Sequence, residues 1–148
     1  MKTLISYFLA ILLTVSITPL EVFAGETERI EFEDGSYFTI QIEESGARAS
    51  GTKTGTKTYT YNSSSGTALW KATVRGTYTY NGSSATCTAS SCDVTIYNSD
   101  WYVVSKSASK NGNSATASVT MGQKILGITA SKKTASIKLT CDANGNLS

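Results

Sequence analysis

Residues 69–82, LWKATVRGTYTYNG, constrain the fold of this chain more than any other stretch. A two-residue period of apolar and polar side chains runs through them and is typical of an antiparallel strand with one buried face. Asn81-Gly82 tolerates positive φ, which suits a tight hairpin turn, so we expect residues 83–88 to fold back beside this strand. The inward set is Trp70, Ala72, Val74, Gly76, Tyr78 and Tyr80, and the outward set is Lys71, Thr73, Arg75, Thr77 and Thr79.

Alternating segments separated by turn residues continue along the rest of the chain. The turns are rich in Asn, Gly, Ser and Asp, which are the residues that turns require. About eight to ten short strands with frequent turns predict an all-β chain folded as a single antiparallel β-sandwich. Beyond the first segment, strands are predicted at residues 93–97, 101–106, 115–121 and 135–141, with a brief apolar run at 125–128.

Residues 1–24 have the pattern of a cleaved signal peptide. Lys2 gives a positive start, an apolar stretch follows at residues 4–15, and Val22-Phe23-Ala24 resembles a cleavage site. The apolar stretch is too short to span a bilayer, and no later segment resembles a membrane anchor. We therefore expect a secreted, extracellular product without a stable membrane anchor.

Residues 25–44 are predicted to form an acidic N-terminal hairpin arm. Apolar residues alternate on both sides of Glu33-Asp34-Gly35-Ser36, which favours two strands that share one apolar face. Residues 45–56 lack apolar periodicity and are rich in Gly, Ser and Thr, as flexible linkers are. The sandwich domain is therefore assigned to residues 57–148.

The charges are divided unevenly between the arm and the body. Residues 26–44 hold seven acidic residues and Arg29, which gives −6, whereas residues 45–148 hold eleven basic and three acidic residues, which gives +8. An isolated hairpin is marginal in water, so the arm must dock on something. We expect it to dock on its own body or on a second copy, so the expected partner is a protein or the chain itself. A total charge of +2 does not favour a nucleic-acid partner.

Three cysteines lie in the exported part, where thiols oxidise, and one of them must remain unpaired. Cys87 and Cys141 fall on predicted inner faces, whereas Cys92 follows the polar residues Ala89-Ser90-Ser91, which we interpret as a turn. Loop closure favours a Cys87–Cys141 disulfide by about 4 kcal/mol and a Cys87–Cys92 disulfide by about half as much. We therefore predict the long bridge, with Cys92 as the free thiol.

Cys87, Trp101 and Cys141 resemble the Cys…Trp…Cys pattern of the immunoglobulin fold, and residues 137–141 resemble one of its core strands. The sequence departs from that pattern at Leu139, where the immunoglobulin fold has a tyrosine two residues before the second cysteine. The resemblance implies an immunoglobulin-like sandwich architecture and no particular function. No particular family is identified.

The chain contains no histidine, which excludes Ser-His-Asp and Cys-His catalysis and the usual zinc sites. No cofactor, metal site or catalytic residue is predicted, and the chain is expected not to be an enzyme. Asp142-Ala143-Asn144-Gly145-Asn146 resembles the start of a calcium loop, but no bidentate Glu follows it, so we interpret it as a turn. Asp93 and Asp100 are the residues that a small exported glycosidase would need to bring together.

Aromatic side chains are the remaining candidates for ligand contacts. Trp70, Tyr78 and Tyr80 share a face with Ala72 and Val74, which indicates core packing. Tyr97, Trp101 and Tyr102 surround a short polar turn and are predicted to form an exposed ligand-binding patch. The sequence thus predicts a secreted, non-catalytic β-sandwich of an exported bacterial type that acts as an adhesion or protein-binding module. The alternatives are a carbohydrate-binding module that contacts a glycan, a small exported enzyme, and a β-rich toxin or inhibitor.

Overall fold

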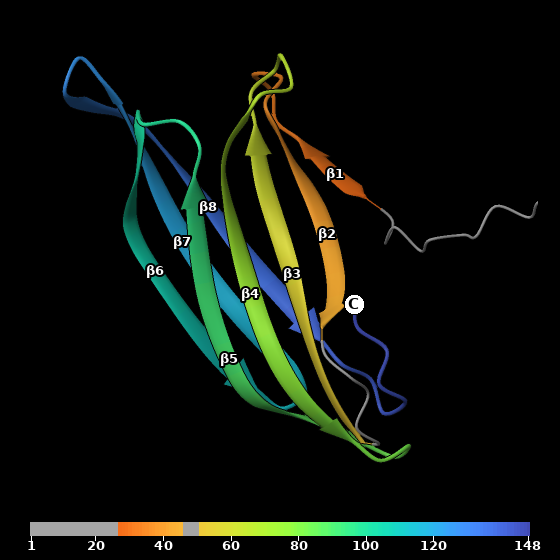
Figure 1. Ribbon diagram of the computed structural model, residues 1–148. Helices are drawn as coiled ribbons and strands as arrows, with labels where there is room; N and C mark the ends of the chain where they lie inside the picture. Colours follow the sequence, from red (N-terminus) through yellow and green to blue (C-terminus); the bar gives the residue numbers. More distant parts are fainter. Residues whose placement is uncertain (1–26, 46–50) are drawn as a thin grey trace, which may run out of the picture.

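The computed structural model describes residues 27–45 and 51–148, and this part of the chain consists of strands and turns. Eight antiparallel strands form two sheets (Figure 1). The five-stranded sheet contains β1 (Glu28–Glu31), β2 (Tyr37–Ser45), β3 (Thr52–Asn62), β4 (Ala68–Tyr80) and β5 (Ala85–Ile96). The three-stranded sheet contains β6 (Trp101–Asn111), β7 (Ser114–Ile125) and β8 (Ile128–Thr140). The predicted signal peptide lies outside the described residues.

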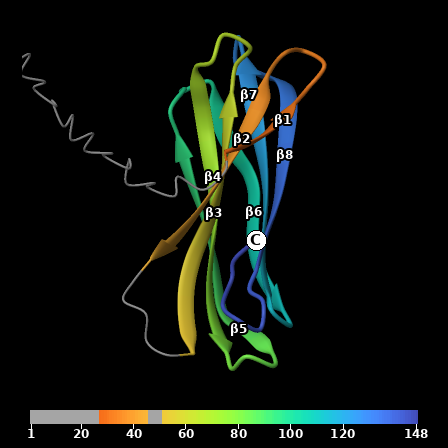
Figure 2. The same cartoon turned by 90° about the vertical axis from the view of Figure 1, so that its right-hand side faces the viewer.

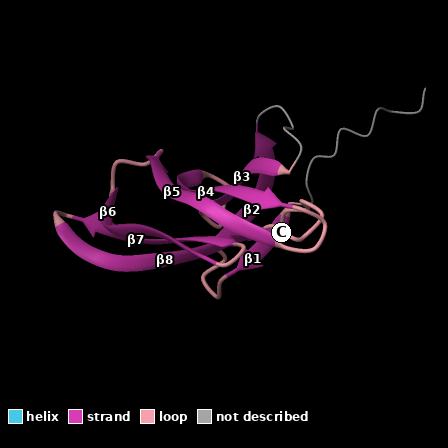
Figure 3. Ribbon diagram, turned by 90° about the horizontal axis from the view of Figure 1, so that it is seen from below, coloured by secondary structure: helices cyan, strands magenta, loops and turns pink. Residues whose placement is uncertain are grey.

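The two sheets face each other as the layers of a β-sandwich, which confirms the predicted architecture. The strands run along the long axis of the molecule (Figure 2), and the view from below separates β3, β4 and β5 from β6, β7 and β8 (Figure 3). In each sheet the neighbouring strands are consecutive in sequence. The Greek-key crossing of the immunoglobulin fold is therefore not seen in the described strands, and the resemblance to that fold is not confirmed.

Strand β4 has the alternation that its sequence predicts. Trp70, Ala72, Val74 and Tyr78 are fully buried, whereas Arg75 is exposed. The predicted hairpin turn follows, with a φ of 83° at Gly82, and β5 pairs with β4 along its whole length. The Asn81 side-chain oxygen accepts hydrogen bonds from the N–H groups of Ser83 and Ser84, at 3.0 and 2.9 Å.

One hydrophobic core lies between the sheets. Small residues on β7 make room for the large side chains of β4, because inward positions of facing sheets must interdigitate. The predicted inward residues of the last strand, Ile137, Leu139 and Cys141, are all fully buried. The other buried residues of the three-stranded sheet are Ala115, Ala117, Val119, Met121 and Ala135.

Tyr78 connects the two sheets directly. Its ring lies against Gly76, where a Cβ atom would clash with the ring, so the glycine provides the space that the tyrosine occupies. Its hydroxyl donates a hydrogen bond of 2.6 Å to the carbonyl of Leu139 on β8. Burial raises the pKa of Tyr78 far above its ordinary value, so the hydroxyl remains a donor at any ordinary pH.

The N-terminal arm is part of the five-stranded sheet. Strand β2 pairs with β3 through nine residue pairs, and the side chains of Phe38 and Ile40 are each only 3% exposed. In this structure the arm therefore docks on its own chain. An ion pair joins Glu44 of the acidic arm to Lys53 of the basic body, with 2.9 Å between Oε1 and Nζ.

Strand β3 begins inside the range that the sequence assigned to a flexible linker. Thr52, Thr54 and Thr56 belong to β3, and residues 46–50 lie outside the described residues. The linker interpretation depended on the missing apolar period. Gly55 occupies an inward position of β3, and the side chain of Leu147 from the C-terminal turn fills the space beside it. An inward position therefore has no apolar side chain of its own, and the apolar period is missing.

We predict that Phe38→Ala lowers the free energy of unfolding by about 3–5 kcal/mol, because a buried ring in the shared core is lost. Ile30→Ala is the control, since Ile30 is 39% exposed, and it should cost about 1 kcal/mol or less. Chemical denaturation at two protein concentrations tenfold apart should give the same midpoint for each variant. A deficit that disappears at the higher concentration would instead show that the arm docks on a second copy.

Candidate contact surface

The exposed apolar side chains of the described residues gather at one end of the sandwich. Eight large apolar residues are more than a third exposed, and one of them, Ile30, lies across the five-stranded sheet from the others, on the edge strand β1. The other seven, which we call the apolar end, come from the end of β5, the turn after it, the start of β6 and the β7–β8 hairpin (Figure 1). They are Ile96, Tyr97, Val103, Val104, Ile125, Leu126 and Ile128.

The tip of the β7–β8 hairpin is the most exposed part of the apolar end. Ile125 and Ile128 are paired across the hairpin and are 54% and 72% exposed, and Leu126 between them is 97% exposed. Leu126 and Gly127 both have positive φ, 52° and 76°, as a two-residue turn of the primed type requires. Positive φ strains a leucine, so an apolar side chain is held at the point of the turn where Asn or Asp is the usual residue.

The turn between β5 and β6 supports this end from the other sheet. The N–H groups of Tyr97 and Asn98 both donate to the carbonyl of Leu69, at 2.9 and 3.0 Å. The N–H of Lys124 on β7 donates to the carbonyl of Asp100 at 2.8 Å. These hydrogen bonds join the two sheets at the apolar end, so its side chains project from a fixed backbone.

A β-bulge exposes two valines on β6. Val103 pairs with Met121, and the register shifts before Ser105, so Val104 has no cross-strand partner. Val103 is 37% exposed and Val104 is 41% exposed. Bulges of this kind redirect side chains at sheet edges, and here the bulge adds aliphatic surface beside the hairpin tip.

The predicted ligand-binding residues Tyr97, Trp101 and Tyr102 are not brought together. Tyr97 is 54% exposed, but Trp101 is only 5% exposed and packs edge-on to Tyr61, with ring centroids 5.3 Å apart. The Tyr102 ring is half-buried over Gly122, and its hydroxyl lies 2.6 Å from that of Thr129. Trp101 is thus a core residue and the one buried residue of β6.

An aromatic cluster lies beneath the apolar end. Trp70 and Trp101 have centroids 6.1 Å apart, and Phe38 and Tyr61 pack against Trp70 at 5.6 and 5.4 Å. The indole N–H groups of both tryptophans are buried without a hydrogen-bond partner, so the neighbouring ring faces are the acceptors available to them. This cluster makes the end of the sandwich rigid.

Sequence analysis missed the five aliphatic residues of the tip and the bulge. The signal was present in the apolar run at residues 125–128, which we interpreted only as a brief run broken by Gly127. Ile125 and Ile128 stand on either side of the Leu126-Gly127 turn, which indicates an exposed hairpin tip. Side chains at a hairpin tip are exposed because no strand continues beyond the turn to cover them. The bulge at Val104 leaves no such signal in the sequence.

The three-stranded sheet is basic throughout. Residues 101–141 contain six lysines and no acidic residue. Lys124 lies over the Tyr102 ring at 5.0 Å, and Lys133 lies over the Phe32 ring at 3.7 Å and the Tyr61 ring at 5.4 Å. Lys133 thus joins β8 to the arm through cation–π contacts.

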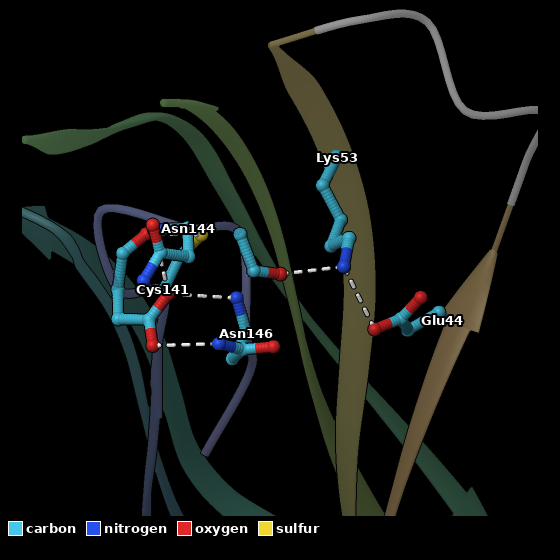
Figure 4. Close-up of polar contacts among 7 residues, drawn as sticks. Glu44, Lys53, Cys141, Asn144 and Asn146 are labelled. Atoms are coloured by element: carbon cyan, nitrogen blue, oxygen red, sulfur yellow. Dashed lines mark hydrogen bonds and ion pairs between the residues drawn. The ribbon is translucent and has the colours of Figure 1, made fainter. Parts of the chain in front are cut away.

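The C-terminal segment is a closed turn, as predicted (Figure 4). Asp142 accepts hydrogen bonds from the Asn144 N–H at 2.8 Å and from Asn146 through its N–H and its side-chain amide, each at 2.9 Å. The side-chain hydrogen bond from Asn146, followed by its backbone N–H, lowers the pKa of Asp142. Lys53 donates to the Gly145 carbonyl and pairs with Glu44, so the turn is connected to β2 and β3.

No group of three or more His, Cys, Asp or Glu residues in residues 27–45 and 51–148 is placed to hold a metal ion.

A shallow depression at the opposite end of the sandwich is lined by Thr79, Tyr80, Asn81, Ser84 and Thr86. Tyr80 packs its ring against Gly145 there. Nowhere in these same residues is a helix long and apolar enough to cross a membrane.

All three cysteines are free thiols in this structure. Cys87 and Cys141 are buried beside the β6–β7 turn, where their N–H groups donate to the carbonyls of Gly112 and Asn113, at 2.7 and 3.0 Å. Burial raises the pKa of each thiol. The predicted turn before Cys92 is wrong, because residues 89–91 belong to β5 and Cys92 lies opposite Val74.

Comparison with protein-family models, with curated proteins and with solved structures gives no match to this chain. By its fold and its surface, this chain is an all-β sandwich with an apolar end.

We predict that Trp101→Ala lowers the free energy of unfolding by about 3–5 kcal/mol, because a buried ring of the aromatic cluster is lost. Trp101→Phe keeps most of the ring contacts and should cost much less. Tyr97→Ala is the exposed control and should leave the melting temperature nearly unchanged. A Trp101→Ala variant as stable as the parent would contradict a core role for this residue.

We predict that oxidative folding forms the Cys87–Cys141 disulfide and leaves Cys92 free. Both cysteines flank the same turn, whereas Cys87 and Cys92 are five residues apart on one strand, about 16 Å, which is too far for a disulfide. Peptide mapping without reduction should find the linked Cys87 and Cys141 peptides. A Cys92→Ser variant should give the same map, and a Cys87–Cys92 peptide would refute the assignment.

Proposed function

We propose that this chain is an exported, non-catalytic binding module of the adhesion type and that it contacts its target through the apolar end. The observation that carries the proposal is that seven of the eight exposed large apolar side chains of the described residues lie on the end of β5, the turn after it, the start of β6 and the β7–β8 hairpin. Single exposed apolar residues are ordinary on soluble proteins, but a contiguous group of them marks a contact surface.

The structure of the apolar end supports a role in contact. Its hairpin tip adds little to the core, since Leu126 is 97% exposed and Ile125 and Ile128 are more than half exposed. They project from a backbone held by hydrogen bonds between the two sheets, including Lys124 to Asp100. A rigid surface loses little conformational entropy when it binds, which favours affinity.

The polar groups of the described residues support binding over catalysis. The depression at the opposite end is lined by hydroxyl, amide and phenol groups, and no carboxylate is among its lining residues. Asp93 faces outward on β5 and Asp100 lies in the β5–β6 turn, and neither has a neighbouring carboxylate in a cavity. A glycan-binding platform has less support than the apolar end, because both tryptophans are buried in the core.

Adsorption to a butyl matrix at low salt tests the proposal without assuming a partner. We predict that the mature chain, residues 25–148, is retained and that the Leu126→Asp/Ile128→Asp variant elutes early, because the most exposed aliphatic surface is lost. Ser83→Asp places a new charge at the exposed β4–β5 turn and should leave retention unchanged. Equal retention of the parent and the double variant, with both folded by melting temperature, would refute the proposal.

A further inference from the structure

The apolar end has the shape and the charge of a membrane-contacting surface. We propose that it docks on the surface of an anionic lipid bilayer, with the β7–β8 tip inserted among the lipids. The inference rests on the proposed function, because it names the target that the apolar end contacts.

The tip is convex and aliphatic. Leu126 stands at the apex with almost no cover, and a Cβ atom on Gly127 would have no heavy atom within 4 Å. A protein partner would need a pocket shaped to receive this apex, whereas lipid chains rearrange around any apolar protrusion. Figure 1 shows the hairpin extending past the β5–β6 turn.

The charged side chains of the β7–β8 hairpin itself are all lysines. Lys124 directly precedes Ile125, and Lys132 lies four residues after Ile128, about 13 Å along β8. Both side chains are exposed. A tip buried about 5–10 Å into the boundary between headgroups and acyl chains would leave these ammonium groups at the depth of the lipid phosphates. Residues 101–141 contain no acidic residue, and the acidic residues that adjoin this region are Asp100, whose carbonyl accepts from the Lys124 N–H, and Asp34 of the arm, which lies near Lys133.

The aromatic residues lie at the depth that an interface requires. Tyr97 is 54% exposed beside the tip, and Tyr102 lies under Lys124 with its hydroxyl on the outer side, near Thr129. Tyrosine is enriched where one end of a side chain meets hydrocarbon and the other meets water. The aliphatic apex, Lys124 and Tyr102 therefore follow one another along the hairpin away from its tip.

A protein partner accounts less well for this arrangement. The centres of protein interfaces are enriched in aromatic residues and depleted in lysine. Here the centre of the surface is aliphatic, and lysines adjoin it on both strands of the hairpin. Charge complementarity with an anionic headgroup layer uses those lysines, whereas a protein interface would have to desolvate them.

Co-sedimentation of the mature chain with lipid vesicles tests the proposal. We expect at least tenfold stronger binding to vesicles of phosphatidylcholine with 30% phosphatidylglycerol than to pure phosphatidylcholine at low salt. Leu126→Asp/Ile128→Asp should reduce binding to the anionic vesicles at least tenfold. Lys124→Gln and Lys132→Gln should each reduce it roughly fivefold, as expected for one headgroup contact.

Lys138→Gln is the matched control, because Lys138 is exposed on the same strand toward the opposite end and pairs with Thr116. It should bind like the parent. Equal binding of all variants, or no preference for anionic vesicles, overturns the inference. Retention on the butyl matrix without vesicle binding would also overturn it, while leaving the proposed binding module intact with a target other than a bilayer. Failure of both assays would remove the proposed function as well.

Discussion

The burial of one face of β4 against the three-stranded sheet is the constraint on which the rest of the structure depends. Trp70, Ala72, Val74 and Tyr78 are completely removed from water. Strand β4 lies between β3 and β5 in the five-stranded sheet. Burial of each large side chain is worth about 1.5–3 kcal/mol, and a shift of one residue in register would turn all four outward. The hydrogen bond from Tyr78 to Leu139 further fixes how β8 lies across β4. Register in β3 and β5 then follows from pairing with β4.

Two open sheets leave exposed edges, and no proline occurs after residue 24 to interrupt them. The described strands protect their edges by other means. Strand β1 is only four residues long and carries Glu28, Arg29 and Glu31, while β6 is interrupted by the bulge at Val104. On β8, Lys133 points inward over Phe32, and an inward charge on an edge strand disfavours the addition of another strand. These features oppose assembly by strand exchange, which agrees with an arm that docks on its own chain.

The sequence alone predicted what depends on local period and turn chemistry. The β4–β5 hairpin, the inward face of β8 and the Asp142 turn are confirmed because each follows from residues close in sequence. Three other features depend on distant residues. Gly55 is covered by Leu147, Cys92 shares the inner face with Cys87 only because a bulge lies between them, and Trp101 is buried by Tyr61 of the other sheet. The apolar end combines four segments, so no single stretch could show it, although the run at 125–128 contains its apex.

The distribution of apolar surface separates what stabilises the sandwich from what it presents to other molecules. The aromatic cluster of Trp70, Trp101 and Tyr61 lies beneath the apolar end. The side chains above it contribute almost nothing to the core, since Ile125, Leu126 and Ile128 are all more than half exposed. A leucine with positive φ at the apex adds strain without any compensating contact inside the fold. Folding alone therefore gives no reason for an aliphatic residue at this position, where Asn or Asp would be less strained and better hydrated. The proposed contact with a surface outside the chain would supply such a reason, since a convex, aliphatic tip with a lysine on each strand of the hairpin suits an anionic bilayer in polarity and charge.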